Sequence, residues 1–98
     1  MAVYAISDEC RHLLDSILPT FNCDRTVDIR GAIEKTIITE KGDASKDKVY
    51  DLYLSIKDFL ERYQFGHSVD YVFIIDKKGD DLKNSGSLRI YEEKEGLN

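Results

Sequence analysis

Residues 46–63 read KDKVYDLYLSIKDFLERY, and this stretch decides the fold. Its apolar residues recur at the spacing i, i+3, i+4, i+7, i+10, i+11 and i+14, which marks one face of an α-helix. They are Val49, Leu52, Tyr53, Ile56, Phe59, Leu60 and Tyr63. No other segment has so regular a pattern, so we predict one long helix from Lys46 to Tyr63.

The segment before this helix, Gly42-Asp43-Ala44-Ser45, has the composition of a turn. Further upstream, Thr26 to Glu40 fits two structures. A helix with Thr26 as its cap and Gly42 as its stop is favoured by the spacing of Ile29, Ala32, Ile33 and Ile37. A strand is favoured by the β-branched run Thr36-Ile37-Ile38-Thr39. We prefer the helix.

The first helix is predicted from its cap and its stripe. Ser7 is a good N-cap, and Asp8 and Glu9 follow in the first turn, where carboxylates favour the helix dipole. The apolar stripe consists of Cys10, Leu13, Leu14, Ile17 and Leu18. Pro19 should end this helix near Leu18. Residues 1–6 fit either a short strand or an early helical turn.

The sequence after the long helix changes to a period of two. From Val69 to Asp76 apolar and other residues alternate, with apolar character on both faces at the centre, which predicts one strand covered on both sides. We expect Lys77 to Gly86 to be a loop or a short helical turn. A second short strand is predicted for Ser87 to Tyr91. The last residues, Glu92 to Asn98, should be a charged and frayed tail.

Composition indicates one small domain that spans residues 1–98. The net charge of −5 argues against nonspecific affinity for nucleic acid or anionic lipid, although a local basic patch remains compatible with it. The first six residues do not resemble a signal peptide, and no run approaches the length of a membrane helix. We therefore predict a cytoplasmic chain without membrane contact.

The chain offers little that could do chemistry. Cys10 and Cys23 indicate a reducing compartment, with one disulfide between them as the alternative. The only cysteine and histidine residues are Cys10, Cys23, His12 and His67, which does not suggest a zinc site. Neither histidine accompanies a nucleophile motif, and there is no glycine-rich phosphate loop. We predict no catalytic residue, metal, cofactor or small-molecule ligand.

One enzymatic alternative is a magnesium-dependent nuclease. Asp76-Lys77-Lys78 closes the predicted strand and resembles the acid-x-Lys part of such sites. The second carboxylate would have to come from Asp51, Asp58 or Asp70. An acid and lysines at a strand end are also common on solvated surfaces, so this is a minor alternative.

The predicted order of helix, helix, long helix and strands resembles a winged helix-turn-helix domain. A local pattern supports the resemblance: residues 71–82 are similar to the last wing strand of MarR-like and PadR-like regulators. There the strand runs into a Lys-Gly pair, and an aliphatic residue follows three positions later, as Lys78, Gly79 and Leu82 do here. The predicted fold class is therefore α+β, with three helices followed by a small antiparallel hairpin or wing.

The resemblance implies a non-catalytic binding domain of the kind found in small DNA-associated transcriptional regulators that act as dimers. The long helix would be the recognition helix and residues 63–70 the wing, with His67 at its tip. Phosphates would be contacted by Lys46, Lys48, Lys57 and His67. The chain departs from the family because the outward face of the long helix carries several carboxylates, which phosphates repel.

That departure favours a second hypothesis. An acidic interaction module of the antitoxin, immunity or inhibitor type would bind a basic protein partner, or a second copy of itself, through the outward face. Tyr50 and Leu54 lie one turn apart outside the main stripe, where they either pack under a neighbouring segment or form a small apolar patch. The predicted interface residues are Asp47, Tyr50, Asp51, Leu54, Asp58 and Glu61.

Overall fold

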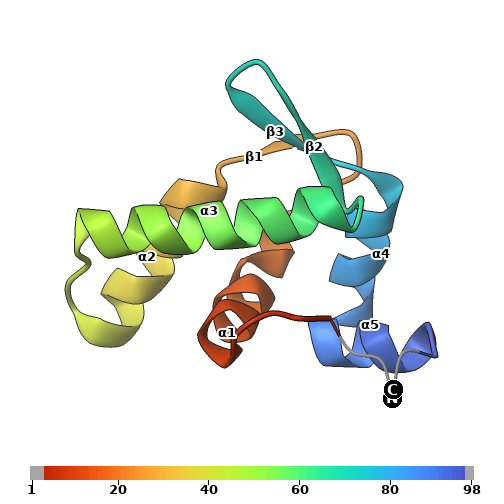
Figure 1. The fold of residues 1–98 in the computed structure, drawn as a ribbon, viewed down its shortest axis with the longest axis horizontal. Coiled ribbons are helices and arrows are strands. Elements are labelled where there is room, and N and C mark those ends of the chain that lie inside the picture. Colours follow the sequence, from red (N-terminus) through yellow and green to blue (C-terminus); the bar gives the residue numbers. More distant parts are fainter. Residues whose placement is uncertain (1–3, 97–98) are drawn as a thin grey trace.

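The computed structural model describes residues 4–96, and Figure 1 shows their arrangement. The elements in this range are α1 (Asp8–Ile17), the 3-10 turn η1 (Leu18–Thr20), β1 (Thr26–Val27), α2 (Ile29–Lys41), α3 (Lys46–Arg62), β2 (Gly66–Val69), β3 (Val72–Ile75), α4 (Lys77–Ser85) and α5 (Leu88–Lys94). The α+β class is thus confirmed. The finer prediction of three helices and then a hairpin is incomplete, because β1 precedes α2 and two helices follow β3.

Helix α3 matches its prediction closely. It begins after Ser45, ends at Arg62 with Tyr63 as its C-cap, and crosses the centre of the molecule (Figure 1). Five residues of the predicted stripe are buried, while Tyr53 and Tyr63 are half-buried against the core. Burying such a stripe against α1, α2 and β2 supplies most of a helix's stability, since propensity alone contributes little.

Helix α1 also forms where its cap and stripe predict it. The Ser7 hydroxyl accepts the backbone N–H of Cys10 at 3.2 Å, and Pro19 lies in η1 directly after the helix. The stripe is buried from Cys10 to Leu18. Residues 4–6 have no regular secondary structure, so neither alternative for this segment holds there, and residues 1–3 lie outside the described range.

The ambiguous segment is the helix α2, with a different cap. Asp28, not Thr26, caps it by accepting the N–H of Gly31 at 3.0 Å, and Thr26 lies in β1. Gly42 ends the helix at a left-handed φ of 81°. The β-branched run does not prevent the helix, because Ile37 packs in the core and the Thr36 hydroxyl donates to the carbonyl of Ala32 within it.

The small antiparallel sheet has the order β1-β3-β2 and contains the main error in the sequence prediction. The expected single strand over Val69–Asp76 is wrong, because Val69 pairs with Val72 and the two residues between them form a tight turn. Asp70 takes a left-handed φ of 54° in this turn, a conformation that aspartate tolerates. The apparent alternation therefore belongs to two strands, and only Phe73 and Ile75 of β3 are buried.

The segment after β3 continues as the nine-residue helix α4, so it is the helical alternative extended rather than a loop. Leu82 is fully buried, which confirms that it returns to the core. Gly79 lies within this helix rather than at a sharp exit. A Cβ atom on Gly79 would lie 2.3 Å from the carbonyl oxygen of Phe65, so glycine is needed for the close approach of the two segments.

The predicted second strand, residues 87–91, is wrong, and α5 takes its place. Ser87 caps this helix by accepting the N–H of Ile90, and the N–H of Leu88 donates to the carboxylate of Asp15 at 2.9 Å. Leu88 and Tyr91 are buried one turn apart. The partner on α1 is 73 residues away in sequence, which explains why a local pattern could not reveal the helix.

The frayed tail is also wrong for Glu92, which is only 1% exposed. Its carboxylate accepts two hydrogen bonds from the guanidinium of Arg11, at 2.8 and 2.9 Å, and one from the backbone N–H of Tyr4 at 2.8 Å. Arg11 also donates to the carbonyl of Tyr4 at 3.0 Å. We call these three residues the clamp, because they fasten the N-terminal segment and α1 to α5.

Two further expectations concern the cysteines and the membrane. Cys10 is buried on the stripe of α1, Cys23 is half-buried, and both are free thiols, so the alternative of a disulfide between them does not hold. Across residues 4–96, no helix combines the length and the apolar character that crossing a membrane requires.

Candidate binding surface on α3 and the hairpin

The outward part of α3 has two sides. Toward the hairpin lie Tyr53 and Lys57, which line one pocket together with residues of the β2–β3 turn. Toward α1 lie Asp47 and Asp51, which line a second hollow together with the start of α1. Helical spacing adds Tyr50, Leu54 and Glu61 to the first side and Asp58 to the second. We call these the hairpin side and the α1 side of α3.

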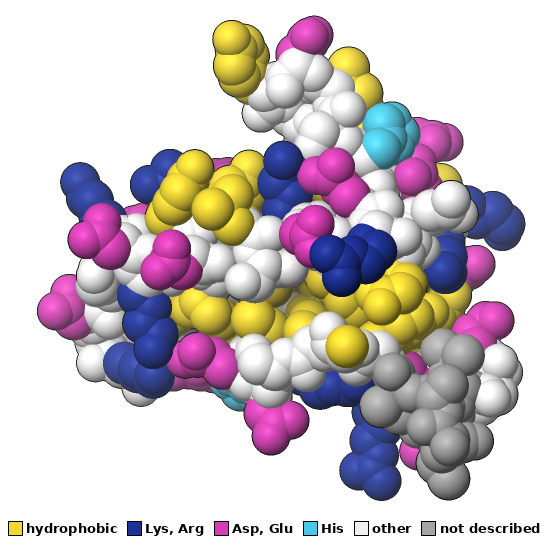
Figure 2. Space-filling model, viewed as in Figure 1, with side chains coloured by type: hydrophobic (Ala, Val, Ile, Leu, Met, Phe, Trp, Pro, Cys, Tyr) yellow, Lys and Arg dark blue, Asp and Glu magenta, His cyan; other side chains and the backbone are white. Residues whose placement is uncertain are grey.

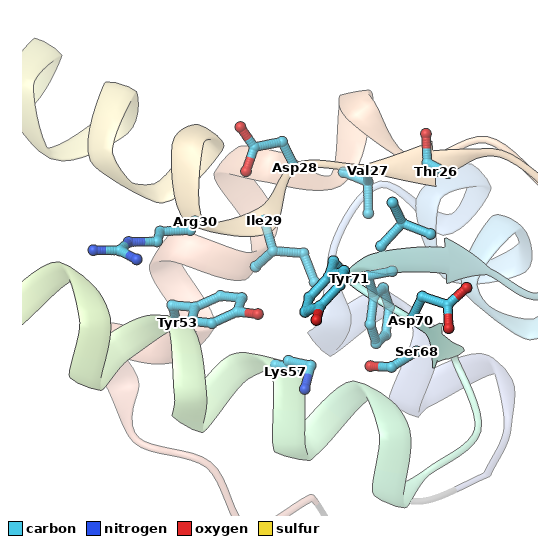
Figure 3. Close-up of a pocket in the computed structure, with 12 residues that line it drawn as sticks. Thr26, Val27, Asp28, Ile29, Arg30, Tyr53, Lys57, Ser68, Asp70 and Tyr71 are labelled. Carbon is cyan, nitrogen blue, oxygen red and sulfur yellow. The ribbon is translucent and has the colours of Figure 1, made fainter.

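The pocket on the hairpin side has a volume of about 540 Å³ and lies between the start of α2, the middle of α3 and the hairpin. In Figure 3 the polar ends of Tyr53, Lys57 and Ser68 lie around its centre, and Tyr71, which is completely exposed, lines it from the hairpin turn. The carboxylates of Asp28 and Asp70 and the guanidinium of Arg30 point outward from it. The remaining lining residues are Thr26, Val27, Ile29, Val72 and Phe73.

Glu61 ties the hairpin to α3. One of its carboxylate oxygens, Oε1, accepts the hydroxyl of Ser68 at 3.1 Å and lies 3.2 Å from the ammonium nitrogen of Lys57. The side chain of Lys57 is 30% exposed, so this ion pair remains accessible from the pocket. These contacts connect the hairpin to the helix beside the pocket.

Hydrophobic side chains are exposed on the same side. Tyr50 and Leu54 of α3 are 45% and 43% exposed, and Val69 and Val72 flank Tyr71, whose side chain is completely exposed. Figure 2 shows hydrophobic groups over the N-terminal half of α3 and at the tip of the hairpin. We call these five residues the apolar face. Arg30 lies beside it, with its guanidinium carbon 5.3 Å from the ring centre of Tyr50.

The α1 side is charged instead. Its hollow of about 490 Å³ contains the carboxylates of Glu9, Asp47 and Asp51 and one cation, Lys48. The ammonium nitrogen of Lys48 lies 3.4 Å from a carboxylate oxygen of Glu9. Asp58 lies two turns beyond Asp51 on this side and binds Arg62 at 2.8 Å. We call Asp47, Asp51 and Asp58 the acidic strip.

The four residues predicted to contact DNA do not form one patch. Lys46 is exposed at the first position of α3, whereas Lys48 faces α1 and Lys57 faces the hairpin. His67 is not at the wing tip, because β2 begins one residue earlier and the turn lies at Asp70 and Tyr71. Its ring nitrogen Nδ1 lies 2.9 Å from the carboxylate of Asp76 at the base of the hairpin.

The geometry gives Asp76 an imidazole partner rather than the second carboxylate that the nuclease alternative requires. Asp70 lies at the opposite end of β3, and Asp51 and Asp58 face α1. Among residues 4–96, no three His, Cys, Asp or Glu side chains are grouped closely enough to hold a metal ion.

The side chains whose pKa differs clearly from its ordinary value lie mainly in and around the clamp. Hydrogen bonds from Arg11 lower the pKa of the Glu92 carboxyl, and the same contact raises the pKa of the Arg11 guanidinium. Burial raises the pKa of Tyr91 to about 12. Strongly perturbed groups often mark active sites, but here the perturbing contacts hold two chain segments together.

Sequence reasoning missed the part of the surface that comes from the hairpin and α2. Tyr71, Val69 and Val72 were read as one strand, and Arg30 was not considered. Asp70 between two apolar runs was the available signal, since aspartate favours tight turns. No family model, curated protein or solved structure matches this chain. Its function therefore has to be inferred from the surface of α3 and the hairpin.

Proposed function

We propose that this chain is a winged-helix-like, non-catalytic protein-binding domain whose α3 binds a basic protein partner through the acidic strip. The main support for this proposal is the hollow on the α1 side of α3. Its lining combines three acidic residues, Glu9, Asp47 and Asp51, with one lysine and with the apolar residues Cys10 and Leu52. A partner that offers lysine or arginine beside an apolar side chain would satisfy both features.

The element order supports the winged-helix part of the proposal. Three helices precede a hairpin that packs beside the third and longest helix, and β1 adds one short strand to its sheet. Leu82, three residues after Gly79, is buried where the resemblance to the regulator families expects an aliphatic residue. In Figure 1 the hairpin follows the C-terminal end of α3 and lies to one side of that helix.

The ion pairs on α3 favour a protein partner over DNA. Lys48, Lys57 and Arg62 each lie within 3.4 Å of a carboxylate oxygen, from Glu9, Glu61 and Asp58 respectively. A phosphate contact at any of these cations would have to compete with a carboxylate that is already in place. Since DNA affinity depends on cations that are available to phosphates, this arrangement weakens it.

Duplex DNA is the second candidate, favoured by the position of the long helix beside the hairpin and by the exposed Lys46 at its start. It predicts binding that falls steeply with salt and weakens when Lys46 and Lys48 are replaced by alanine. The measurement is fluorescence anisotropy of a labelled duplex at low salt. Saturable binding with this salt dependence would replace the protein-binding proposal with the DNA function.

The protein-binding proposal is tested with a partner captured from cells that encode the chain and then purified. We expect a basic protein whose complex weakens as salt increases. Reversing the acidic strip in Asp47→Lys, Asp51→Lys, Asp58→Lys should weaken the complex about tenfold or more, mainly through slower association.

A matched control changes the net charge equally at three exposed carboxylates elsewhere, in Glu34→Lys, Asp81→Lys, Glu93→Lys. The proposal requires that this control bind much more tightly than the strip variant. If both variants lose affinity equally, overall charge and not the strip determines binding, and the proposed site is wrong.

A further inference from the structure

We infer that the apolar face binds a second copy of this chain about a two-fold axis, with Tyr71 of each copy entering the pocket of the other. This surface lies on the hairpin side of α3. The partner proposed above binds the α1 side, so the two inferences rest on different residues and can fail separately.

Tyr71 has the properties of an interface anchor. It projects from a two-residue turn, its side chain is 104% exposed, and Val69 and Val72 beside it are 43% and 46% exposed. Tyrosine is among the residues that contribute most to protein interfaces, because a large ring becomes buried while few rotatable bonds are immobilised. The tight turn fixes the backbone at Tyr71, so binding has to order only the two side-chain torsions of the ring.

The pocket beside the hairpin offers a matching receptor on the same chain. Val27, Ile29 and Phe73 give it apolar walls, and the side chain of Tyr53 lies across it (Figure 3). At its centre Lys57 and the hydroxyl of Ser68 can bond the hydroxyl of an entering tyrosine. Because anchor and pocket lie on one face, a two-fold axis forms the same pair of contacts twice.

Charges near the pocket also fit a second copy. All three charged residues line the pocket: Asp70 and Arg30 point outward on opposite sides of it, and Lys57 lies between them (Figure 3). When Tyr71 enters the pocket of the other copy, the adjacent Asp70 approaches these cations. The acidic strip lies on the opposite side of α3, so the strips of the two copies do not face each other in this dimer.

A dimer interface of ordinary size would cover a modest part of the molecular surface. A stable protein interface buries on the order of 800 Å² on each partner. The surface of this chain is 6081 Å², so such an interface would cover about one-eighth of it. Five of the seven large hydrophobic residues that are exposed among the described residues belong to the apolar face. The other two are Ile38 and Ile90.

Salt dependence separates this contact from a contact with a basic protein. Each copy carries a net charge of −5, so two copies repel at long range. Salt screens this repulsion, with a Debye length of about 30 Å at 0.01 M and 8 Å at 0.15 M, but hardly affects short apolar contacts. Self-association should therefore be roughly fivefold tighter at the higher salt concentration, whereas binding of a basic partner should weaken.

The experiment is sedimentation equilibrium of the full chain from micromolar to sub-millimolar concentration. The average mass should rise with concentration from 11.3 kDa toward twice that value, and the dimer should tighten with salt. Tyr71→Ser should weaken association about tenfold or more. Ile90→Ser, which removes an apolar side chain of 43% exposure on α5, should leave association unchanged.

A double-mutant cycle then tests the charge contact. Asp70→Asn and Arg30→Gln should each weaken the dimer several-fold, and their effects should not add, because each removes the same pair. Asparagine tolerates the left-handed turn, so Asp70→Asn keeps the hairpin intact. A chain that stays monomeric throughout, a dimer unaffected by Tyr71→Ser, or a dimer that weakens with salt would each overturn the inference.

Discussion

The clamp and the hairpin tip both depart from the usual pattern, in which charged side chains are exposed and large apolar side chains are buried. In the clamp a carboxylate, Glu92, is buried, and at the hairpin tip an aromatic ring, Tyr71, is fully exposed. Charged groups are rarely buried, and large apolar groups are rarely left completely in water. Glu92 is compensated inside the chain by three hydrogen bonds. Tyr71 has no equivalent compensation among residues 4–96, which is why we propose that a second copy of the chain covers it.

The difference teaches that the two regions should respond differently to substitution. Changes in the clamp should alter the free energy of unfolding and leave binding intact. Changes at the hairpin tip should alter binding and leave the free energy of unfolding intact. The following predictions test this separation.

The largest effect is expected for Glu92→Ala. The substitution leaves the guanidinium of Arg11 half-buried without its carboxylate and removes the acceptor for the Tyr4 N–H, which should lower the free energy of unfolding by about 3 kcal/mol. Urea unfolding measures this. Glu93→Ala on the same helix is the control, because its ion pair with Arg89 is exposed and should contribute less than about 0.5 kcal/mol. If both substitutions lowered the free energy of unfolding equally, the clamp would contribute no more to stability than an exposed ion pair.

A second effect concerns acid. Arg11 lowers the pKa of Glu92 in the folded chain, below the usual value of 4.5. The folded state therefore binds this proton less readily than the unfolded state, so the contribution of Glu92 to stability is complete above pH 4.5 and is lost as pH falls through the lower folded pKa. Thermal unfolding at several pH values should show a steeper acid loss for the natural chain than for Glu92→Gln.

A smaller effect is expected where the hairpin contacts α3. Glu61→Gln weakens the bonds to Ser68 and Lys57, which should lower the free energy of unfolding by about 1 kcal/mol and loosen the hairpin from α3. Amide hydrogen exchange in β2 should become faster. Asp58→Asn, which breaks only an exposed pair with Arg62, should leave this exchange unchanged. Unaltered exchange in Glu61→Gln would mean that the core alone holds the hairpin.

The smallest effect on stability should come from Tyr71→Ser. Because the ring is completely exposed, its removal should change the free energy of unfolding by less than about 0.5 kcal/mol, measured where the chain is monomeric. A destabilisation comparable to that of Glu92→Ala would contradict the comparison, since it would mean that Tyr71 supports the fold itself.

The parts of the fold that sequence predicted correctly are those with a local cause. The stripe of α3 and the Ser7 cap of α1 lie within a few residues of the atoms they organise. The parts that were wrong depend on contacts between distant segments. Helix α5 depends on Asp15, and the burial of Glu92 depends on Arg11, which lies 81 residues earlier.

The candidate site divides in the same way. A helical projection already separated Tyr50, Leu54 and the acidic strip from the buried stripe of α3. It could not show that Lys48 is paired with Glu9, or that Arg30 lies beside Tyr50, because each pair joins two helices. The pocket is built from α2, α3 and the hairpin together, so it exists only once these elements have packed.

The bond between Tyr4 and Glu92 also bears on how the chain folds. It joins residues 88 positions apart, so it closes a loop that contains almost the entire chain. Closing such a loop is entropically costly, and the contact should form after the local helices and the hairpin. Its loss should therefore accelerate unfolding more than it slows folding. During synthesis Tyr4 emerges long before α5, so it can dock only once α5 has been made.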